Sequence, residues 1–146
     1  MAFFGQNKIL AHFATFLIKR DKPYGKTSRG GSMEKEIYPK MITGLPEVDI
    51  PFKGVKGWLL QGIDKQVVFF DIEPNASIPE HSHGEQWGVV VDGEAELVVD
   101  GVKKICRKGD TYHIPAGALH SVTFRTRFKT IDFFAEVDRY KPKSKT

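Results

Sequence analysis

Two Asp-Gly pairs, at 92–93 and 100–101, divide a run of alternating apolar and polar residues into short segments. An Asp-Gly pair between such segments is a strong signal for a tight turn between antiparallel strands, because both residues tolerate the positive φ angles that the turn requires. We therefore predict strands at 87–91, 94–99 and 102–105, joined by hairpins into a meander.

Short apolar, β-branched and aromatic segments on both sides of this region also predict strands. They lie at 57–61 and 66–72 before it, and at 111–114, 120–124 and 129–134 after it. No long helical period follows residue 33 in the sequence. Residues 33–146 are therefore expected to form one all-β domain with a closed or sandwiched antiparallel sheet.

The composition fits a single domain with its own core. The chain has 146 residues, of which 40% are hydrophobic, and 11 of them are phenylalanines, which suffices for one core. Cys106 is the single cysteine, so the chain forms no intramolecular disulfide, as a reducing compartment would permit. We expect Cys106 to be a small packing residue and the protein to be cytoplasmic.

The excess of positive charge is confined to residues 1–32. This leader carries six basic residues against one acidic residue, and because the formal charge of the whole chain is +4, the rest is close to neutral. A nearly neutral domain has no electrostatic footprint for nucleic acid. We therefore exclude nucleic acid as a partner.

Residues 7–20 of the leader predict an amphipathic helix, with Asn7 as its N-cap and apolar residues such as Phe13 and Leu17 on one face. This helix is too short to span a bilayer, and no small-residue cleavage site of a signal peptide follows it. An organellar transit peptide, a membrane-surface helix and a helix that packs on a partner all remain open. An equally strong alternative is that residues 1–32 are not part of the functional protein, which would then start at Met33.

Three histidines and a glutamine predict a metal site. His81 and His83 are two residues apart, so on a strand both imidazoles would face the same side and bind one cation. His120 follows a tight turn at Pro115-x-Gly117, where the glycine tolerates positive φ and redirects the chain. Gln86 would supply a fourth, neutral oxygen. We therefore predict one divalent cation with four ligands.

These two segments resemble the paired sequence signatures of the cupin superfamily. The matching positions are His81, His83 and Gly93 in the first signature, and Gly109, Pro115, Gly117 and His120 in the second. Asn75 replaces the leading glycine, and asparagine best imitates the left-handed backbone of glycine. Gln86 stands where a glutamate ligand is usual, and Phe124 replaces the final asparagine. The resemblance covers roughly residues 55–135 and implies a jelly-roll barrel with the metal inside.

The ligand set bears on the chemistry of the site. Gln86 is one residue closer to His83 than the usual ligand, so Glu85 is an alternative ligand. Three imidazoles and an amide are neutral, and a bound divalent cation would keep its full charge, which favours Lewis-acid chemistry. Histidine and oxygen ligands suit Zn, Ni, Fe and Mn alike. We expect His113 to have a structural or rim role.

A second group of candidates lies near the C-terminus. Asp132 and Phe134 share one face of a predicted strand, and Arg139 follows them. If that face is inward, Asp132 would be a general base beside the metal and Phe134 a substrate platform. Arg139 would bind a substrate carboxylate through two hydrogen bonds, and we also expect Tyr112 to contact the substrate. The alternative for Asp132 is an exposed position on the strand.

The Asp-x-Phe sequence and the arginine after it resemble the small cupins of pectin degradation, which convert cyclic unsaturated uronates to linear keto sugars. Those cupins are also similar in their three histidines and one glutamine, although Arg139 is displaced by about one residue. The resemblance implies a metal-dependent enzyme that opens or tautomerises a small oxygenated metabolite such as a sugar acid. We keep two alternatives open, an Fe-dependent dioxygenase and a cupin that binds a small ligand without turnover.

Small jelly-roll domains leave sheet edges that must be covered. Pairing of two protomers through residues 35–60 would cover one such edge, so we predict a homodimer. The expected partners are thus a small-molecule substrate and a second copy of the chain, without a stable membrane span.

Overall fold

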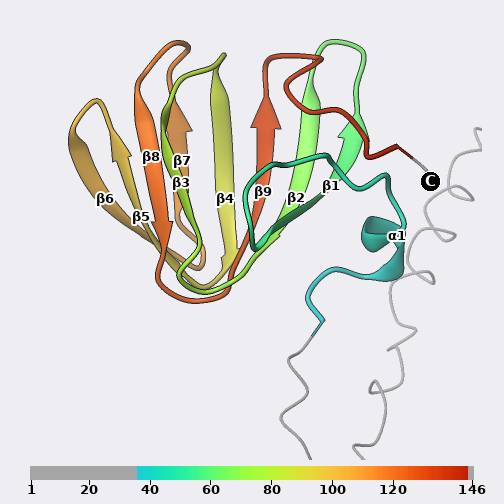
Figure 1. The fold of residues 1–146 in the computed structure, drawn as a ribbon, viewed down its shortest axis with the longest axis horizontal. Coiled ribbons are helices and arrows are strands. Elements are labelled where there is room, and N and C mark those ends of the chain that lie inside the picture. The colour runs from blue at the N-terminus through green and yellow to red at the C-terminus, as the bar shows by residue number, and fades with distance from the viewer. Residues whose placement is uncertain (1–35, 145–146) are drawn as a thin grey trace, which may run out of the picture. The chain divides into compact units, whose positions relative to one another are not determined.

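The computed structural model describes residues 36–144, so the helix predicted at 7–20 lies outside the described residues. One short helix, α1, precedes nine strands in this part of the chain (Figure 1). The elements are α1 (Lys40–Thr43), β1 (Val55–Gln61), β2 (Gln66–Ile72), β3 (Ser77–His81), β4 (Gln86–Asp92), β5 (Glu94–Val99), β6 (Val102–Arg107), β7 (Thr111–Ile114), β8 (His120–Phe124) and β9 (Phe128–Phe134).

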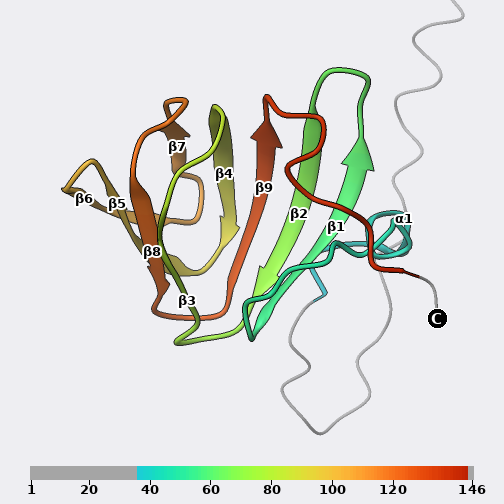
Figure 2. The ribbon, with the colours of Figure 1, turned by 45° about the horizontal axis from the view of Figure 1, so that its top comes forward.

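The strands form two antiparallel sheets that face each other (Figures 1 and 2). One sheet has five strands in the order β1-β2-β9-β4-β7, and the other has four strands in the order β3-β8-β5-β6. Strands that are neighbours in a sheet are mostly distant in sequence, as in a jelly roll. The predicted all-β jelly-roll fold is confirmed.

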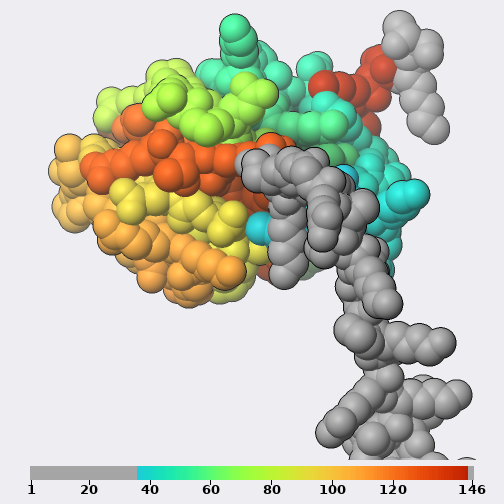
Figure 3. All heavy atoms as spheres, turned by 90° about the horizontal axis from the view of Figure 1, so that it is seen from below, coloured from blue at the N-terminus to red at the C-terminus, as the bar shows by residue number. Residues whose placement is uncertain are grey.

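The core lies between the two sheets and follows from the alternation of side chains along each strand. In β2, every second residue from Gln66 to Ile72 is buried, and those between them are only partly buried. Because successive side chains on a strand point to opposite faces, this pattern places Val68, Phe70 and Ile72 in the core. In the view from below, β5 and β6 (yellow to orange) and the segment before β1 (cyan) lie on opposite sides of the described domain (Figure 3).

The hairpin predicted at Asp100-Gly101 is confirmed. Asp100 has a φ of 47° and Gly101 a φ of 78°, and Val99 pairs with Val102 across the turn. Two successive positive φ angles are the signature of the two-residue turn that matches the twist of a hairpin.

The hairpin predicted at Asp92-Gly93 is wrong, and with it the meander. β4 pairs with β7 and β9, whereas β5 pairs with β6 and β8, so the chain crosses from one sheet to the other at Gly93. Gly93 has a φ of 89°, and a Cβ atom there would lie 2.1 Å from the carbonyl oxygen of Arg127. The glycine is needed for this close approach between two connections, not for a hairpin turn.

The structure gives the bounds of the strand that was expected to carry His81 and His83, which the sequence analysis did not define: it is β3. β3 pairs with β8, with a shift of register between Ile78 and His81. The strand ends at His81, so His83 lies in the following loop and not on the strand as predicted. Asn75, which replaces a glycine of the cupin signature, has a φ of 63°, as expected for an asparagine that imitates glycine.

β1 is an edge strand, and the segment before it covers part of that edge. The N–H of Val48 donates to the carbonyl of Gly57 (3.0 Å), and the N–H of Leu59 donates to the carbonyl of Pro46 (2.9 Å). Pairing of protomers through residues 35–60 stays a prediction. Among residues 36–144, no helix has the length and apolar character needed to cross a membrane.

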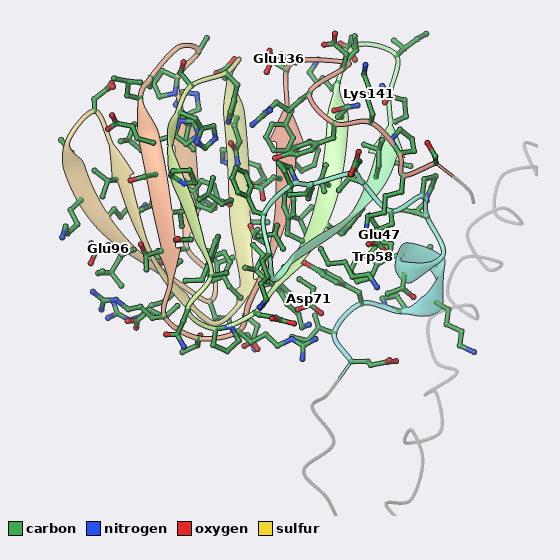
Figure 4. All side chains as sticks on the ribbon, viewed as in Figure 1. Glu47, Trp58, Asp71, Glu96, Glu136 and Lys141 are labelled. Atoms are coloured by element: carbon green, nitrogen blue, oxygen red, sulfur yellow. The ribbon has the colours of Figure 1, made fainter. Side chains whose placement is uncertain are left out.

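A cluster of ion pairs joins β2 to the start of β9. Oδ2 of Asp71 lies 2.6 Å from Nζ of Lys129 and 2.8 Å from Nη2 of Arg127. The hydroxyl of Tyr38 donates to the carbonyl of Thr130 (2.9 Å) next to this cluster. In Figure 4, Asp71 lies at the lower end of the strands and Glu136 at the upper end.

Candidate metal centre

Three histidines from two strands and a loop meet at one end of the barrel. His81 is the last residue of β3 and pairs with His120, the first residue of β8, while His83 follows two residues after β3. One candidate ligand atom from each histidine lies within 4.8 Å of the other two. These three histidines are therefore positioned to bind one metal ion.

Backbone carbonyls orient the three imidazoles. Nδ1 of His81 lies 2.8 Å from the carbonyl oxygen of Pro79, that of His83 lies 2.8 Å from Gly84, and that of His120 lies 2.9 Å from Ala118. A carbonyl only accepts hydrogen bonds, so each Nδ1 carries the proton and each Nε2 keeps its lone pair. This is the second contact that metal-binding histidines usually make, and the three residues fit a divalent cation.

Two of the three histidines, His83 and His120, have lowered pKa values, which favour the neutral form that metal binding requires. Burial lowers the pKa of His83 to about 4, and the positive charge of Arg139 lowers it further. Burial likewise lowers the pKa of His120, which is almost fully buried. Neutral imidazoles here need to release no proton before they bind a cation.

The loop that carries His83 is tied to the rest of the barrel by three hydrogen bonds. The N–H of Gly117 donates to the carbonyl of His83 (2.8 Å), and the N–H of Ala135 donates to the carbonyl of Glu85 (3.0 Å). The N–H of Gly84 donates to Oε2 of Glu136 (2.8 Å). These contacts, not a shared strand, bring His83 to the other two histidines.

Gln86 faces the cavity beside the histidines, whereas Glu85 points outward. The first residue of β4, Gln86, is buried, and its Nε2 donates to Oδ1 of Asp132 (3.0 Å). Glu85 lies in the preceding loop, and its Oε1 is 2.7 Å from Nε2 of His113. Both side chains of this pair are more than half exposed, at 58% and 53%. Gln86, and not Glu85, is therefore close to the candidate metal centre, and His113 lies on the outer surface.

Asp132 is buried in the same cavity and faces inward, so it is not the exposed strand residue of the alternative prediction. Its Oδ1 accepts hydrogen bonds from the hydroxyl of Tyr112 (2.5 Å) and from Gln86 (3.0 Å). Burial raises the pKa of Asp132 to about 6, although these hydrogen bonds act in the opposite direction. A buried carboxyl thus touches Gln86, which lines the same cavity as the three histidines.

Phe134 and Arg139 both lie near the histidines. The Phe134 ring is buried, and its centroid is 5.7 Å from that of the His83 ring. The guanidinium of Arg139 stacks 5.0 Å from the Tyr140 ring. Its Nε is buried and has no hydrogen-bond partner among residues 36–144. Asp132, Phe134 and Tyr140 line the cavity, whereas Arg139 itself does not.

The cavity between the sheets has a volume of about 70 Å³. The three histidines, Gln86 and Asp132 are among its polar lining residues, and most of its other walls are apolar side chains from both sheets. The sequence analysis missed two polar side chains of this lining, Thr130 and Tyr140. Thr130 shares the inward face of Asp132 and Phe134, so the period of two along β9 is the signal that would have found it.

Comparison with known proteins agrees with this geometry. Residues 68–134 match the family model of the cupin domain. An RmlC-like cupin from Shewanella frigidimarina is 28% identical, with a TM-score of 0.58 over 64% of this chain and 86% of that one. KdgF from Halomonas sp. is 21% identical, with a TM-score of 0.56 over 62% and 87% of the two chains. No curated protein matches the sequence.

A mutant of oxalate decarboxylase OxdC from Bacillus subtilis shares the fold at 18% identity, with a TM-score of 0.55. The match covers 64% of this chain but only 28% of that longer protein. The jelly roll, the cupin-domain match and the three clustered histidines agree with one another. The chain therefore contains a cupin domain, matched over residues 68–134, with three histidines positioned to bind a metal ion.

Proposed function

We propose that this cupin is a metal-dependent enzyme that opens or tautomerises a small oxygenated metabolite, with a sugar acid as the substrate. The contact between Gln86 and Asp132 carries the proposal, because it joins a side chain of the candidate metal centre to a buried carboxyl in the same cavity. In this proposal His81, His83, His120 and Gln86 hold one divalent cation. The sequence resemblance to pectin-degradation cupins supports an unsaturated uronate as the substrate.

All four proposed ligands are neutral. When bound, a divalent cation with neutral ligands supplies Lewis-acid chemistry, which polarises a carbonyl or hydroxyl oxygen of the substrate. The ligands suit Zn, Ni, Fe and Mn alike, so the metal is defined here only as a divalent cation.

Asp132 is the proposed proton carrier. Tyr112 and Gln86 both donate to its Oδ1, so we assign proton transfer to its Oδ2. A carboxylate in a buried cavity can take a proton from a carbon or hydroxyl next to the polarised oxygen and return it to a neighbouring atom. This transfer is what ring opening or tautomerisation requires.

Two further side chains are proposed to position the substrate. Phe134 gives an apolar surface beside His83. Arg139 keeps its Nε without a hydrogen-bond partner among the described residues, and a buried donor of this kind is costly unless a ligand satisfies it. A carboxylate on the substrate would accept this hydrogen bond, as the acid group of a uronate can.

The test is turnover by the metal-loaded protein. With a cyclic unsaturated uronate as substrate, proton NMR should show conversion to the linear keto form. Asp132→Asn should lower turnover by roughly 100-fold or more, since general-base catalysis contributes at least that much. It should leave metal content unchanged, because the asparagine oxygen still accepts from Gln86. Glu85→Gln is the control and should keep full activity. Absence of turnover in the metal-loaded wild type would contradict the proposal.

Binding without turnover is a second candidate, which the apolar lining favours. Most of the cavity wall is aliphatic or aromatic, including Phe70, Leu97 and Phe124. Such a lining suits a ligand with an apolar body better than a polyhydroxylated sugar. Saturable binding of a small ligand that is recovered unchanged would support this candidate against the enzyme.

A further inference from the structure

Gly88 lies in the middle of β4, between Tyr112 on β7 and Asp132 on β9, and pairs in register with both. A Cβ atom at this position would lie 2.2 Å from Oδ1 of Asp132, 2.3 Å from Cζ of Tyr112 and 2.5 Å from the Tyr112 hydroxyl. Real Cβ atoms do not approach other atoms so closely. Only glycine leaves room for these two side chains.

The Tyr112 side chain occupies this space in order to reach Asp132. Its hydroxyl donates to Oδ1 of Asp132 (2.5 Å) and lies 3.0 Å from Oγ1 of Thr130. Thr130 in turn donates to the carbonyl of Val89 (2.9 Å). The hydroxyl proton of Tyr112 is therefore committed to Asp132 and is not available to a substrate, although the Tyr112 ring lines the cavity.

Asp132 determines which way the Gln86 amide is turned. A carboxylate oxygen accepts hydrogen bonds and cannot donate them, so it selects the orientation in which Nε2 of Gln86 points toward it. In that orientation Oε1 stays free to bind a cation. If Asp132 moved, the amide would lose the contact that distinguishes its two ends.

We propose that Gly88 and Tyr112 are positioning residues, which hold Asp132 where it presents the oxygen of the Gln86 amide, and not the nitrogen, to the cation. This inference rests on the proposed function in one respect, the ligation of the cation by Gln86. It extends that function by two residues that touch neither the cation nor the reacting atoms.

The test uses Co²⁺ alone, bound to the full-length protein, because its visible absorption spectrum reports the ligands around it. Tyr112→Phe keeps the ring and removes the hydroxyl. It should weaken Co²⁺ binding about 10-fold, as loss of an outer hydrogen-bond partner does. Its spectrum should shift in the same direction as that of Gln86→Ala. Gly88→Ala should act in the same way and more strongly.

Gly57→Ala is the matched control for crowding. Gly57 also lies inside a strand of the five-stranded sheet, and a Cβ there would meet the side chains of Val68, Phe70 and Val48 at 2.8–3.0 Å. This substitution should destabilise the fold and leave the Co²⁺ spectrum unchanged. Circular dichroism establishes whether each variant is folded. If Gly88→Ala is not folded, Tyr112→Phe alone tests the positioning inference.

The outcomes separate the two proposals. A spectrum that changes in Gln86→Ala but stays as in the wild type in Tyr112→Phe would overturn the positioning inference alone. A spectrum that is unchanged in Gln86→Ala would show that the amide is not a ligand and would overturn both the inference and the proposed ligand set. Lack of uronate turnover, in a protein whose spectrum responds to Tyr112→Phe, would overturn the proposed reaction alone.

Discussion

Polar side chains near the two ends of β9 are held by different kinds of contact, ion pairs at one end and hydrogen bonds to backbone carbonyls at the other. At its start, Lys129 and the preceding Arg127 form ion pairs with Asp71 at 2.6 and 2.8 Å. At its other end, next to Phe134, the histidines are held by neutral hydrogen bonds to backbone carbonyls. The charged cluster ties two strands together, whereas the neutral one leaves each imidazole with a free electron pair.

The difference teaches why the candidate metal centre contains so few charged contacts. A carboxylate hydrogen-bonded to each histidine would raise the pKa of the imidazole and favour its protonated form, which cannot bind a cation. A backbone carbonyl also raises the pKa of the imidazole that it accepts from, but at His83 and His120 burial outweighs this contribution. The ion pairs at the start of β9 have no such constraint, and there two cations share the carboxylate of Asp71.

Among the substitutions that test this comparison, loss of a histidine should have the largest effect, and the effect is on metal binding. We expect His120→Ala to weaken metal binding beyond the roughly 10- to 100-fold that follows loss of an outer partner, because a ligand itself is removed. Metal content by mass spectrometry and competition with a chelator measure this change. His113→Ala removes an exposed histidine outside the cluster and should keep the metal. Equal loss in both variants would contradict the assignment of the site.

Removal of Asp71 should have an intermediate effect, on stability and not on metal binding. Asp71→Asn leaves the buried Lys129 without its carboxylate partner, which should cost about 3 kcal/mol of unfolding free energy at pH 7. Urea denaturation measures this loss. Glu96→Gln, in an exposed ion-pair network with Arg125 and Lys103, is the control and should cause no measurable change.

The effect of Asp71→Asn should depend on pH. Burial opposes ionisation of Asp71, but the hydrogen bonds and charges of Arg127 and Lys129 outweigh it and lower the pKa of this carboxyl. A lowered folded-state pKa contributes stability that is fully present above the unfolded value of about 3.9 and is lost as pH falls through the folded value. The difference between wild type and Asp71→Asn should therefore shrink below about pH 4. A difference that stays constant into acid would exclude the ion pair as its cause.

Substitution of Glu136 should have the smallest effect on metal binding, because this side chain contacts only the loop that carries His83. Its carboxylate accepts a hydrogen bond from the N–H of Gly84, next to His83. Glu136→Ala should weaken metal binding about 10-fold, or about 1.4 kcal/mol. Glu136→Gln, which still accepts that hydrogen bond, should weaken it much less. Glu85→Ala, an outward-facing residue of the same loop, is the control, and an equal effect of all three variants would exclude a role for the hydrogen bond.

Strand positions were predictable because alternation is a local property of the sequence. The prediction at 66–72 coincides with β2, and that at 94–99 with β5. Pairing was less predictable. Asp92-Gly93 and Asp100-Gly101 carry the same dipeptide and both have a glycine at positive φ, yet only the second forms a hairpin. The difference arises from contacts of β4 with β9, a strand far away in the sequence, which hold β4 in the other sheet.

The candidate metal centre, like the fold, was predictable only in part. The three histidines and Gln86 were predictable from their spacing and from the cupin resemblance, and the histidines do meet. The strand that was expected to align His83 with His81 ends before His83. Contacts with Gly117 and Glu136, on distant segments, place the histidine instead. A hydrogen bond between residues so far apart has no signal in the local sequence.

The sequence by itself determined the chemical character of this protein: an all-β chain with histidines at cupin ligand positions and with an acidic residue, Asp132, on the same strand face as Phe134. These properties depend on residue type and on the period of two along a strand. Only the tertiary structure decided which atoms are presented to a cation. Each imidazole donates from Nδ1 to the carbonyl of Pro79, Gly84 or Ala118, which leaves its other nitrogen free, and Asp132 turns the amide of Gln86. Such orientations depend on partners that folding brings together across strands and turns, and residue spacing alone does not specify them.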